Sequence, residues 1–191
     1  GSCFPKDVRA LASTARNVGY EPLILDSITK VNEAQKEIIM TMVLSHFKGN
    51  IEGLKFAIWG LAFKPNTDDI REAPSLIVIN ELLAKNAIVS AYDPVANEES
   101  NKMFRSEQSI SFANSHYDAL IQADALILLT EWKQFRSPDF SHVVNVMRKP
   151  VIFDGRNVFH PEISLKYGID YYSIGRKPSL GRSLQFTKEK E

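Results

Sequence analysis

The sequence has only one cysteine and no long apolar run. One cysteine cannot form an internal disulfide, and no N-terminal segment resembles a signal peptide, so we expect a reducing, cytoplasmic location. No apolar run approaches the about 18 residues that a membrane-spanning helix needs, so we expect no membrane partner. Lysine plus arginine and aspartate plus glutamate each number 23, without the positive excess typical of nucleic-acid binding. An anionic ligand would need a local site.

Three common kinds of chemical site are also missing. The four histidines lack the spacing of metal ligands, so we expect no metal. No serine lies in a GxSxG context, so nothing supports a serine triad. The turn after the first predicted strand, GLAFKP, lacks the GxGxxG pattern that lets a backbone approach a dinucleotide pyrophosphate. This part of the chain is therefore not expected to be a dinucleotide site.

Residues 1–52 are expected to form a helical segment. Apolar side chains recur there three and four positions apart, which is the period of a helix. Two helices fit the pattern, separated near Gly19, and Asp26 or Ser27 is a candidate N-cap for the second, which would end at Gly49. This long amphipathic helix either caps the following sheet or forms a subunit interface, and the sequence leaves both open.

Residues 53–176 are expected to form an α/β domain, a Rossmann-like, doubly wound and mainly parallel sheet. Short β-rich runs alternate there with helical stretches, which is typical of βαβ units. The predicted strands are 55–59, 88–92, 110–112, 125–130, 151–154 and 171–174, and the predicted helices are 74–85, 117–122, 140–147 and 161–167. Ligands of such folds bind beyond the carboxyl ends of the strands. Residues 177–191 show no periodicity and are predicted to be a loose tail.

The N-terminal segment GSCFPKD could carry a nucleophile. Cys3 lies near Lys6 and Asp7, ahead of a helical stretch, and both a nearby cation and a helix start favour the reactive thiolate. The alternative is a buried, inert cysteine, which is the commoner fate of a lone cysteine. The flanking charged pair favours the nucleophile.

Three basic residues that follow predicted strands are candidate phosphate ligands. Lys64 and Arg71 lie in FKPNTDDIREAP, where lysine could act as a point charge and arginine as a bidentate fork. An ordinary solvated loop with local ion pairs explains this composition equally well. Arg156, in FDGRN, is either an exposed turn residue or a ligand clamp, and its place on the expected binding edge favours the clamp.

Two of these segments together resemble the UDP-glucose/GDP-mannose dehydrogenase family. GSCFPKD is similar to the catalytic cysteine motif of that family, and GLAFKPNTDDIREAPS is similar to its sugar-nucleotide-binding loop. DALILLTEW and IFDGRN are similar to later stretches, so the resemblance extends to about Arg176.

The resemblance implies a two-step oxidation of a sugar C6 hydroxyl to a carboxylate with two NAD+. Cys3 would attack an intermediate aldehyde to give a thiohemiacetal, whose oxidation yields a thioester that water hydrolyses. Asp7 would handle the proton or the water. The implied substrate is UDP-glucose, with UDP-N-acetylhexosamines or GDP-mannose as alternatives. A noncatalytic nucleotide-binding or interaction module is the alternative outside enzymes.

The resemblance also implies roles for other positions. The residues that match substrate-contacting positions of the family are Phe63, Lys64 and Arg156. The residues that match NAD-contacting positions of the family are Arg71 and, through their backbone, Cys3, Phe4, Pro5 and Lys6.

The NAD-binding domain of the family would precede Gly1, and the start at GSCF without an initiator methionine fits a fragment. The chain alone is therefore expected to bind UDP-sugar without completing the oxidation. The central helix of the family pairs subunits, which implies a homodimer of the longer protein.

Overall fold

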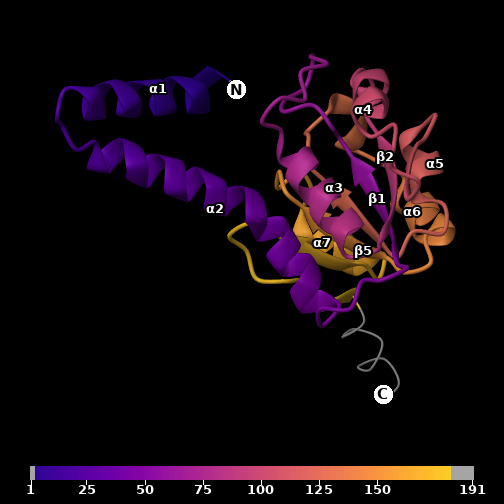
Figure 1. Cartoon of the computed structure of the whole chain (residues 1–191). Coiled ribbons are helices and arrows are strands. Elements are labelled where there is room, and N and C mark those ends of the chain that lie inside the picture. Colours follow the sequence, from indigo (N-terminus) through magenta and orange to yellow (C-terminus); the bar gives the residue numbers. More distant parts are fainter. Residues whose placement is uncertain (1–2, 182–191) are drawn as a thin grey trace.

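The computed structural model describes residues 3–181, apart from the side chains of Cys3, Ile163 and Ser164. Figure 1 shows a helical arm that leads into an α/β domain. The arm consists of α1 (Cys3–Asn17) and α2 (Leu23–His46), which pack against each other. α2 then continues along the side of the domain, whereas α1 lies out along the first half of α2 (Figure 1).

The domain is built on a six-stranded sheet in which every strand pairing is parallel. Its strands are β1 (Lys55–Trp59), β2 (Ile88–Tyr92), β3 (Ile110–Phe112), β4 (Ala125–Leu128), β5 (Val151–Asp154) and β6 (Asp170–Ser173). Their order, β3-β2-β1-β4-β5-β6, changes direction beside β1, which is the doubly wound arrangement. The predicted Rossmann-like α/β fold is therefore confirmed.

Helices cover both faces of the sheet. They are α3 (Pro74–Ala84), α4 (Asn97–Met103), α5 (His116–Leu120), the 3-10 turn η1 (Lys133–Phe135), α6 (Phe140–Val146) and α7 (Pro161–Lys166). Phe56 and Ile58 of β1 belong to the core shared with α2 and α3, whereas Ala57 and Trp59 belong to the core shared with α5 and α6. Burial on both faces explains why the strands read as continuous apolar runs.

The long helix α2 serves two surfaces. Its second half caps the sheet, because Ile39 and Val43 are buried in the core with α3. Its first half does not, because Leu23 and Ile24 expose most of their side chains. The capping role that the sequence left open is thus present, and it uses only half of the helix. No described helix combines the length and apolarity needed to cross a bilayer.

The prediction that Asp26 or Ser27 caps the second helix is wrong. α2 begins at Leu23 with Pro22 at the cap position, and Asp26 lies in the first helical turn, where it pairs with Arg16 of α1. An acidic side chain is stabilising there because it faces the unpaired backbone N–H groups of the helix start.

Two further features differ from the predictions. α4 and η1 were not expected, because their sequences NEESNKM and KQF carry too few apolar residues to show a period. Part of the predicted loose tail is fixed in place: Ser179 exchanges two backbone hydrogen bonds with Tyr171 of β6, and the N–H of Gly181 donates to Asp170. Residues 182–191 lie outside the described part of the chain.

Candidate functional site

The loops that follow β1, β2, β4 and β5 leave from one edge of the sheet, because the strands are parallel. Gly60, directly after β1, has a φ of 93°, and a Cβ added there would lie 2.4 Å from the Cβ of Thr130. Only glycine allows both this conformation and this approach. The hydroxyl of Thr130 donates to the carbonyl of Ala62, which fastens the first loop to the end of β4.

The carboxylate of Asp93, after β2, is buried and accepts five hydrogen bonds. Its Oδ2 accepts from the backbone N–H groups of Leu61 and Ala62 and from Nε1 of Trp132, at 2.8, 3.1 and 3.0 Å. Its Oδ1 accepts from two N–H groups of its own turn, both at 2.9 Å. Asp93 therefore fixes the start of the loop that carries the predicted substrate residues.

A second buried carboxylate, Asp154, shapes the turn that carries Arg156. Its Oδ1 accepts from the backbone N–H of Arg156 at 2.9 Å. Its Oδ2 accepts from the N–H of Phe159 and from the hydroxyl of Tyr171, both at 2.9 Å. Burial, and then the charge of Asp154, raise the pKa of Tyr171 well above its usual value, so this hydroxyl remains a donor.

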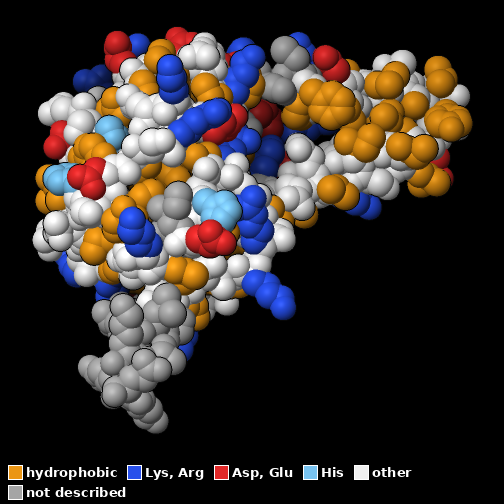
Figure 2. All heavy atoms as spheres, turned by 180° about the vertical axis from the view of Figure 1, so that it is seen from behind, with side chains coloured by type: hydrophobic (Ala, Val, Ile, Leu, Met, Phe, Trp, Pro, Cys, Tyr) orange, Lys and Arg blue, Asp and Glu red, His pale blue; other side chains and the backbone are white. Residues whose placement is uncertain are grey.

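A pocket of about 310 Å³ lies between the arm and this edge of the sheet. Figure 2 shows the hollow from behind, with charged side chains inside it. The residues that line it come from α1, α2 and the loops after β1, β4, β5 and β6: Pro5, Asn32, Gln35, Lys36, Ile39, Phe63, Glu72, Pro74, Leu129, Gly155, Arg156 and Ile174. The volume is at the small end of the range for ligand pockets, about 300–1,000 Å³.

Arg156 lines the pocket and is held by three groups of the protein. Its Nε donates to the carbonyl of Leu129 at 2.7 Å and lies 3.1 Å from the carboxylate of Glu131. Its Nη2 donates to the carbonyl of Phe63 at 2.8 Å. The guanidinium is therefore fixed in orientation on the pocket wall, as a ligand clamp requires.

Phe63 and Lys64 occupy the same edge as Arg156, but they differ in position. Phe63 lines the pocket, whereas Lys64 is exposed and does not. The Nζ of Lys64 lies 5.3 Å from the centre of the Phe63 ring. Arg156 donates a hydrogen bond to the carbonyl of Phe63, the residue directly before Lys64. Of the two predicted cations, Arg156 lines this cavity and Lys64 does not.

The cysteine motif begins α1, and one of its residues reaches the pocket. Pro5 lines the pocket together with Phe63, whereas Phe4, Lys6 and Asp7 are exposed. The side chain of Cys3 lies outside the described part of the structure; its backbone begins α1. The motif and the substrate loop, distant in sequence, thus border one cavity.

Arg71 is turned to solvent, with 78% of its side chain exposed. Its Nε and Nη2 donate to the two carboxylate oxygens of Asp69, each at 2.9 Å. This is the local ion pair that the ordinary-loop interpretation predicts. Arg71 does not line the pocket, and its role toward a cofactor stays a prediction.

Four polar pocket residues were missed from the sequence. Asn32, Gln35 and Lys36 lie on one side of α2 ahead of the buried Ile39, and Glu72 follows Arg71 in the loop. The available signal was weak: the polar side chains at positions 32, 35 and 36 lie on one side of α2 together with Ile39, and three polar residues on a helix are commonly a solvated face. Among the described residues, no group of three or more histidines, cysteines or carboxylates could hold a metal.

The fold and the pocket define a Rossmann-like ligand-binding domain with a helical arm. Residues 57–161 match the UDP-binding domain of the UDP-glucose/GDP-mannose dehydrogenase family, and residues 1–34 match the central domain of the same family. The chain belongs to the UDP-glucose/GDP-mannose dehydrogenase family.

Relatives with assigned names agree with this. A UDP-glucose 6-dehydrogenase of Pseudomonas aeruginosa is 45% identical over 92% of this chain, and AglM, a UDP-glucose 6-dehydrogenase of Haloferax volcanii, is 38% identical over 91%. The chain spans 40% and 38% of the lengths of these relatives.

Solved structures give the same family. A UDP-glucose dehydrogenase from Pyrobaculum islandicum superposes with a TM-score of 0.72 at 32% identity, over 83% of this chain and 34% of that protein. A UDP-D-ManNAc dehydrogenase from Pyrococcus horikoshii also gives 0.72, at 25% identity, over 92% of this chain and 38% of that protein.

Proposed function

We propose that this chain is the UDP-sugar-binding and cysteine-bearing part of a cytoplasmic UDP-glucose 6-dehydrogenase, which oxidises UDP-glucose to UDP-glucuronate. The observation that carries the proposal is the shared pocket: Pro5 of the cysteine motif, Phe63 of the loop and Arg156 of the β5 turn border one cavity. The relatives named above support UDP-glucose as the substrate.

In this proposal the cations at the sheet edge bind the diphosphate. The guanidinium of Arg156 already stands in a fixed orientation, so little side-chain freedom would be lost on binding. Lys64 is exposed beside it and would approach a phosphate as a mobile point charge. A uridine diphosphate placed along this edge would direct its sugar toward the cysteine motif.

The covalent step belongs to Cys3. The C6 alcohol would be oxidised to an aldehyde, and the thiolate of Cys3 would then add to the aldehyde carbon, forming a C–S bond while the aldehyde oxygen takes up a proton. Oxidation of this thiohemiacetal would leave a thioester. Two NAD+ would accept the two hydrides, one for each oxidation. Water attacks the thioester, the C–S bond breaks, and the carboxylate leaves while the thiol is restored. Asp7, exposed on the same helical turn, would accept the proton from this water.

NAD would be bound largely by sequence outside this chain. The β1 turn reads GLAFKP and lacks the GxGxxG glycines that let a backbone approach a dinucleotide pyrophosphate. The groups of this chain proposed to reach NAD are the exposed side chain of Lys6, the backbone at the start of α1, and Arg71, whose guanidinium is paired with Asp69. These would lie at the edge of the cofactor site.

Isothermal titration with UDP, UDP-glucose and GDP-mannose tests the binding proposal. We expect UDP and UDP-glucose to bind, and GDP-mannose to bind more weakly. Tighter binding of GDP-mannose would favour the alternative sugar nucleotide in this family. Absence of any heat of binding with UDP would contradict the proposal.

Ligand protection of Cys3 tests the covalent proposal. Saturating UDP-glucose should slow alkylation of Cys3 by iodoacetamide at pH 7, because the sugar C6 would occupy the space beside the thiol. UDP, which has no sugar, should protect less. Mass spectrometry of the alkylated peptide measures both rates. Equal alkylation rates with and without UDP-glucose, under conditions where calorimetry shows binding, would show that the Cys3 thiol does not lie beside the bound sugar.

We also infer that the longer protein is a homodimer that pairs through the arm. Leu23, Ile24 and Val31 expose 64%, 77% and 62% of their surface on one apolar face, which Figure 2 shows as the orange end of the arm. An exposed apolar patch of this kind marks an interface. In sedimentation velocity, Ile24→Glu should shift the protein toward monomer, whereas Val95→Glu, at an exposed valine outside the arm, should not. A monomeric wild-type protein would disprove the arm as a self-association surface for this chain.

A further inference from the structure

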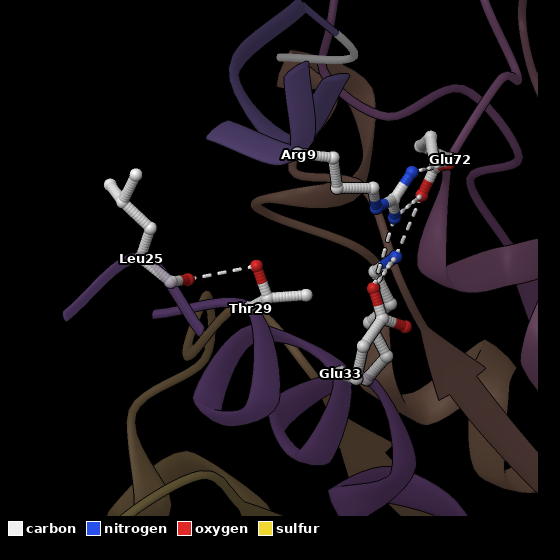
Figure 3. Close-up of polar contacts among 6 residues, drawn as sticks. Arg9, Leu25, Thr29, Glu33 and Glu72 are labelled. Atoms are coloured by element: carbon white, nitrogen blue, oxygen red, sulfur yellow. Dashed lines mark hydrogen bonds and ion pairs between the residues drawn. The ribbon is translucent and has the colours of Figure 1, made fainter. Parts of the chain in front are cut away.

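Four charged side chains connect the arm to the loop after β1 (Figure 3). Glu72, at the end of the loop, accepts hydrogen bonds from both terminal nitrogens of Arg9 on α1, at 3.0 and 3.3 Å, and from Nζ of Lys36 on α2, at 2.9 Å. Glu33 of α2 contacts the same two cations, at 3.2 and 3.3 Å. Each cation is therefore shared by two carboxylates.

Glu72 holds a special place in this cluster. Its ion pairs with Arg9 and Lys36 join both helices of the arm to the α/β domain. Lys36 is nearly enclosed, with 9% of its side chain exposed, and a buried ammonium is costly unless a carboxylate accompanies it. Both Lys36 and Glu72 line the pocket that Pro5 and Phe63 share.

The backbone at Glu72 is adapted to this contact. Its φ of 59° lies in the left-handed region, which non-glycine residues adopt at a cost and only where the surroundings hold them. The next residues, Ala73 and Pro74, begin α3. The loop therefore turns sharply before α3, and this turn brings the Glu72 carboxylate to the arm.

We propose that Glu72 is a positioning residue: its ion pairs with Arg9 and Lys36 hold α1, the helix that begins at Cys3, against the loop that carries Phe63. The inference rests on the proposed function, because the groups brought together are those of the proposed reaction. A covalent step needs its reacting atoms in contact at a defined angle, so a loose α1 would slow it even with every reacting group present.

An incidental surface ion pair is the competing explanation. Isolated exposed ion pairs contribute little to stability, whereas a network of several charges around an enclosed one contributes more. The chain offers a matched example of the first kind: Glu98 and Lys102 pair within α4, and 85% of the Glu98 side chain is exposed. The two cases can therefore be compared in one protein.

Hydrogen exchange tests the proposal on the whole chain. Glu72→Gln should speed exchange of the α1 amides from residues 8 to 14 by about 10-fold, the loss expected for charge-assisted hydrogen bonds. Amides of β1 and β4 should keep their wild-type rates. Glu98→Gln is the control and should leave α1 unchanged. Equal α1 exchange in wild type and Glu72→Gln, or acceleration that includes β1 and β4, would overturn the positioning role.

A charge exchange separates positioning from ordinary packing. Arg9→Glu and Glu72→Arg should each speed α1 exchange, because each places like charges together. The double variant restores an opposite pair between the same two positions, although position 72 then faces Lys36, and position 9 faces Glu33, with like charges. Its loss of protection should therefore be smaller than the sum of the two single losses. Additive damage in the double variant would show that the ion pair is not what holds α1.

The pH dependence has a defined sign. Hydrogen bonds from Arg9 and then Lys36 lower the pKa of Glu72 to about 2, from 4.5 in the absence of neighbours. A carboxylate with a lowered pKa stabilises the folded arrangement fully above its unperturbed pKa, and this contribution disappears as the pH falls toward 2. The difference in α1 exchange between wild type and Glu72→Gln, in the cluster that also contains Arg9, Lys36 and Glu33, should thus be constant from pH 5 to 8 and should shrink below pH 4.5.

These outcomes are independent of ligand binding. A wild-type chain that fails to bind UDP would overturn the proposed function, and the exchange comparison would still report whether Glu72 holds α1. A chain that binds UDP while Glu72→Gln exchanges like wild type would overturn the positioning role alone.

Discussion

Asp93→Asn should be the most destabilising single substitution among those considered, lowering the free energy of unfolding by about 3–5 kcal/mol. The new amide keeps the size of the carboxylate but replaces one oxygen with an NH2 group, which must face either the three donors now bound to Oδ2 or the two now bound to Oδ1. Donor would then face donor in a buried site, where an unpaired polar group is costly. Urea denaturation followed by tryptophan fluorescence measures the change, and Trp132 is itself one of the three donors.

The control for this substitution is Asp68→Asn, at an exposed position in the loop after β1. The same change in charge should move the free energy of unfolding there by no more than about 0.5 kcal/mol. A loss below about 1 kcal/mol at Asp93 would mean that the carboxylate does not organise the loops after β1 and β4 in the way the hydrogen bonds indicate.

Arg156→Ala should weaken UDP binding by about 10- to 100-fold, because one or two charge-assisted hydrogen bonds to phosphate are lost. Lys64→Ala should have a smaller effect, since its ammonium is exposed and more screened. Isothermal titration measures both. The distant, exposed Arg105→Ala serves as the matched control for loss of a positive charge.

Arg156 also supports the loop, so a second variant is needed. Arg156→Lys keeps the charge but cannot reach both the Leu129 and Phe63 carbonyls with a planar fork. We expect intermediate affinity from it, and a urea midpoint within error of that of Arg156→Ala. Unchanged affinity in both Arg156→Ala and Lys64→Ala would remove the diphosphate site from this edge of the sheet.

The fold could be predicted from the sequence because its signals are local. Runs such as KFAIW and VIFD are buried on both faces, so they read as strands without any knowledge of their neighbours. The polar residues that follow them could be assigned to one edge because parallel strands end on the same side. α4 escaped prediction for the opposite reason, since its surface sequence has almost no apolar residues to set a period.

The site could be predicted only in part. Phe63 and Arg156 were expected at a common cavity and do line one, whereas the structure places Lys64 beside that cavity and Arg71 away from it. The roles of all four, and of the cysteine motif, stay predictions. Asp93 also follows a strand at this edge, but both of its carboxylate oxygens accept hydrogen bonds within the fold. Lys36 and Glu72 meet because α2 packs along the sheet, and no local sequence pattern predicts this long-range contact.

The helix α2 contacts the turn at Gly155 with its second half and carries the exposed apolar face of the arm on its first half. A Cβ at Gly155 would meet the Ile39 side chain at 3.4 Å, so α2 rests directly on the turn that presents Arg156. If pairing of two copies changes the affinity for nucleotide by some factor, thermodynamic linkage requires nucleotide binding to change the affinity between the two copies by the same factor. Titrations with UDP at protein concentrations above and below the dissociation constant of the dimer would measure that factor as a difference in UDP affinity.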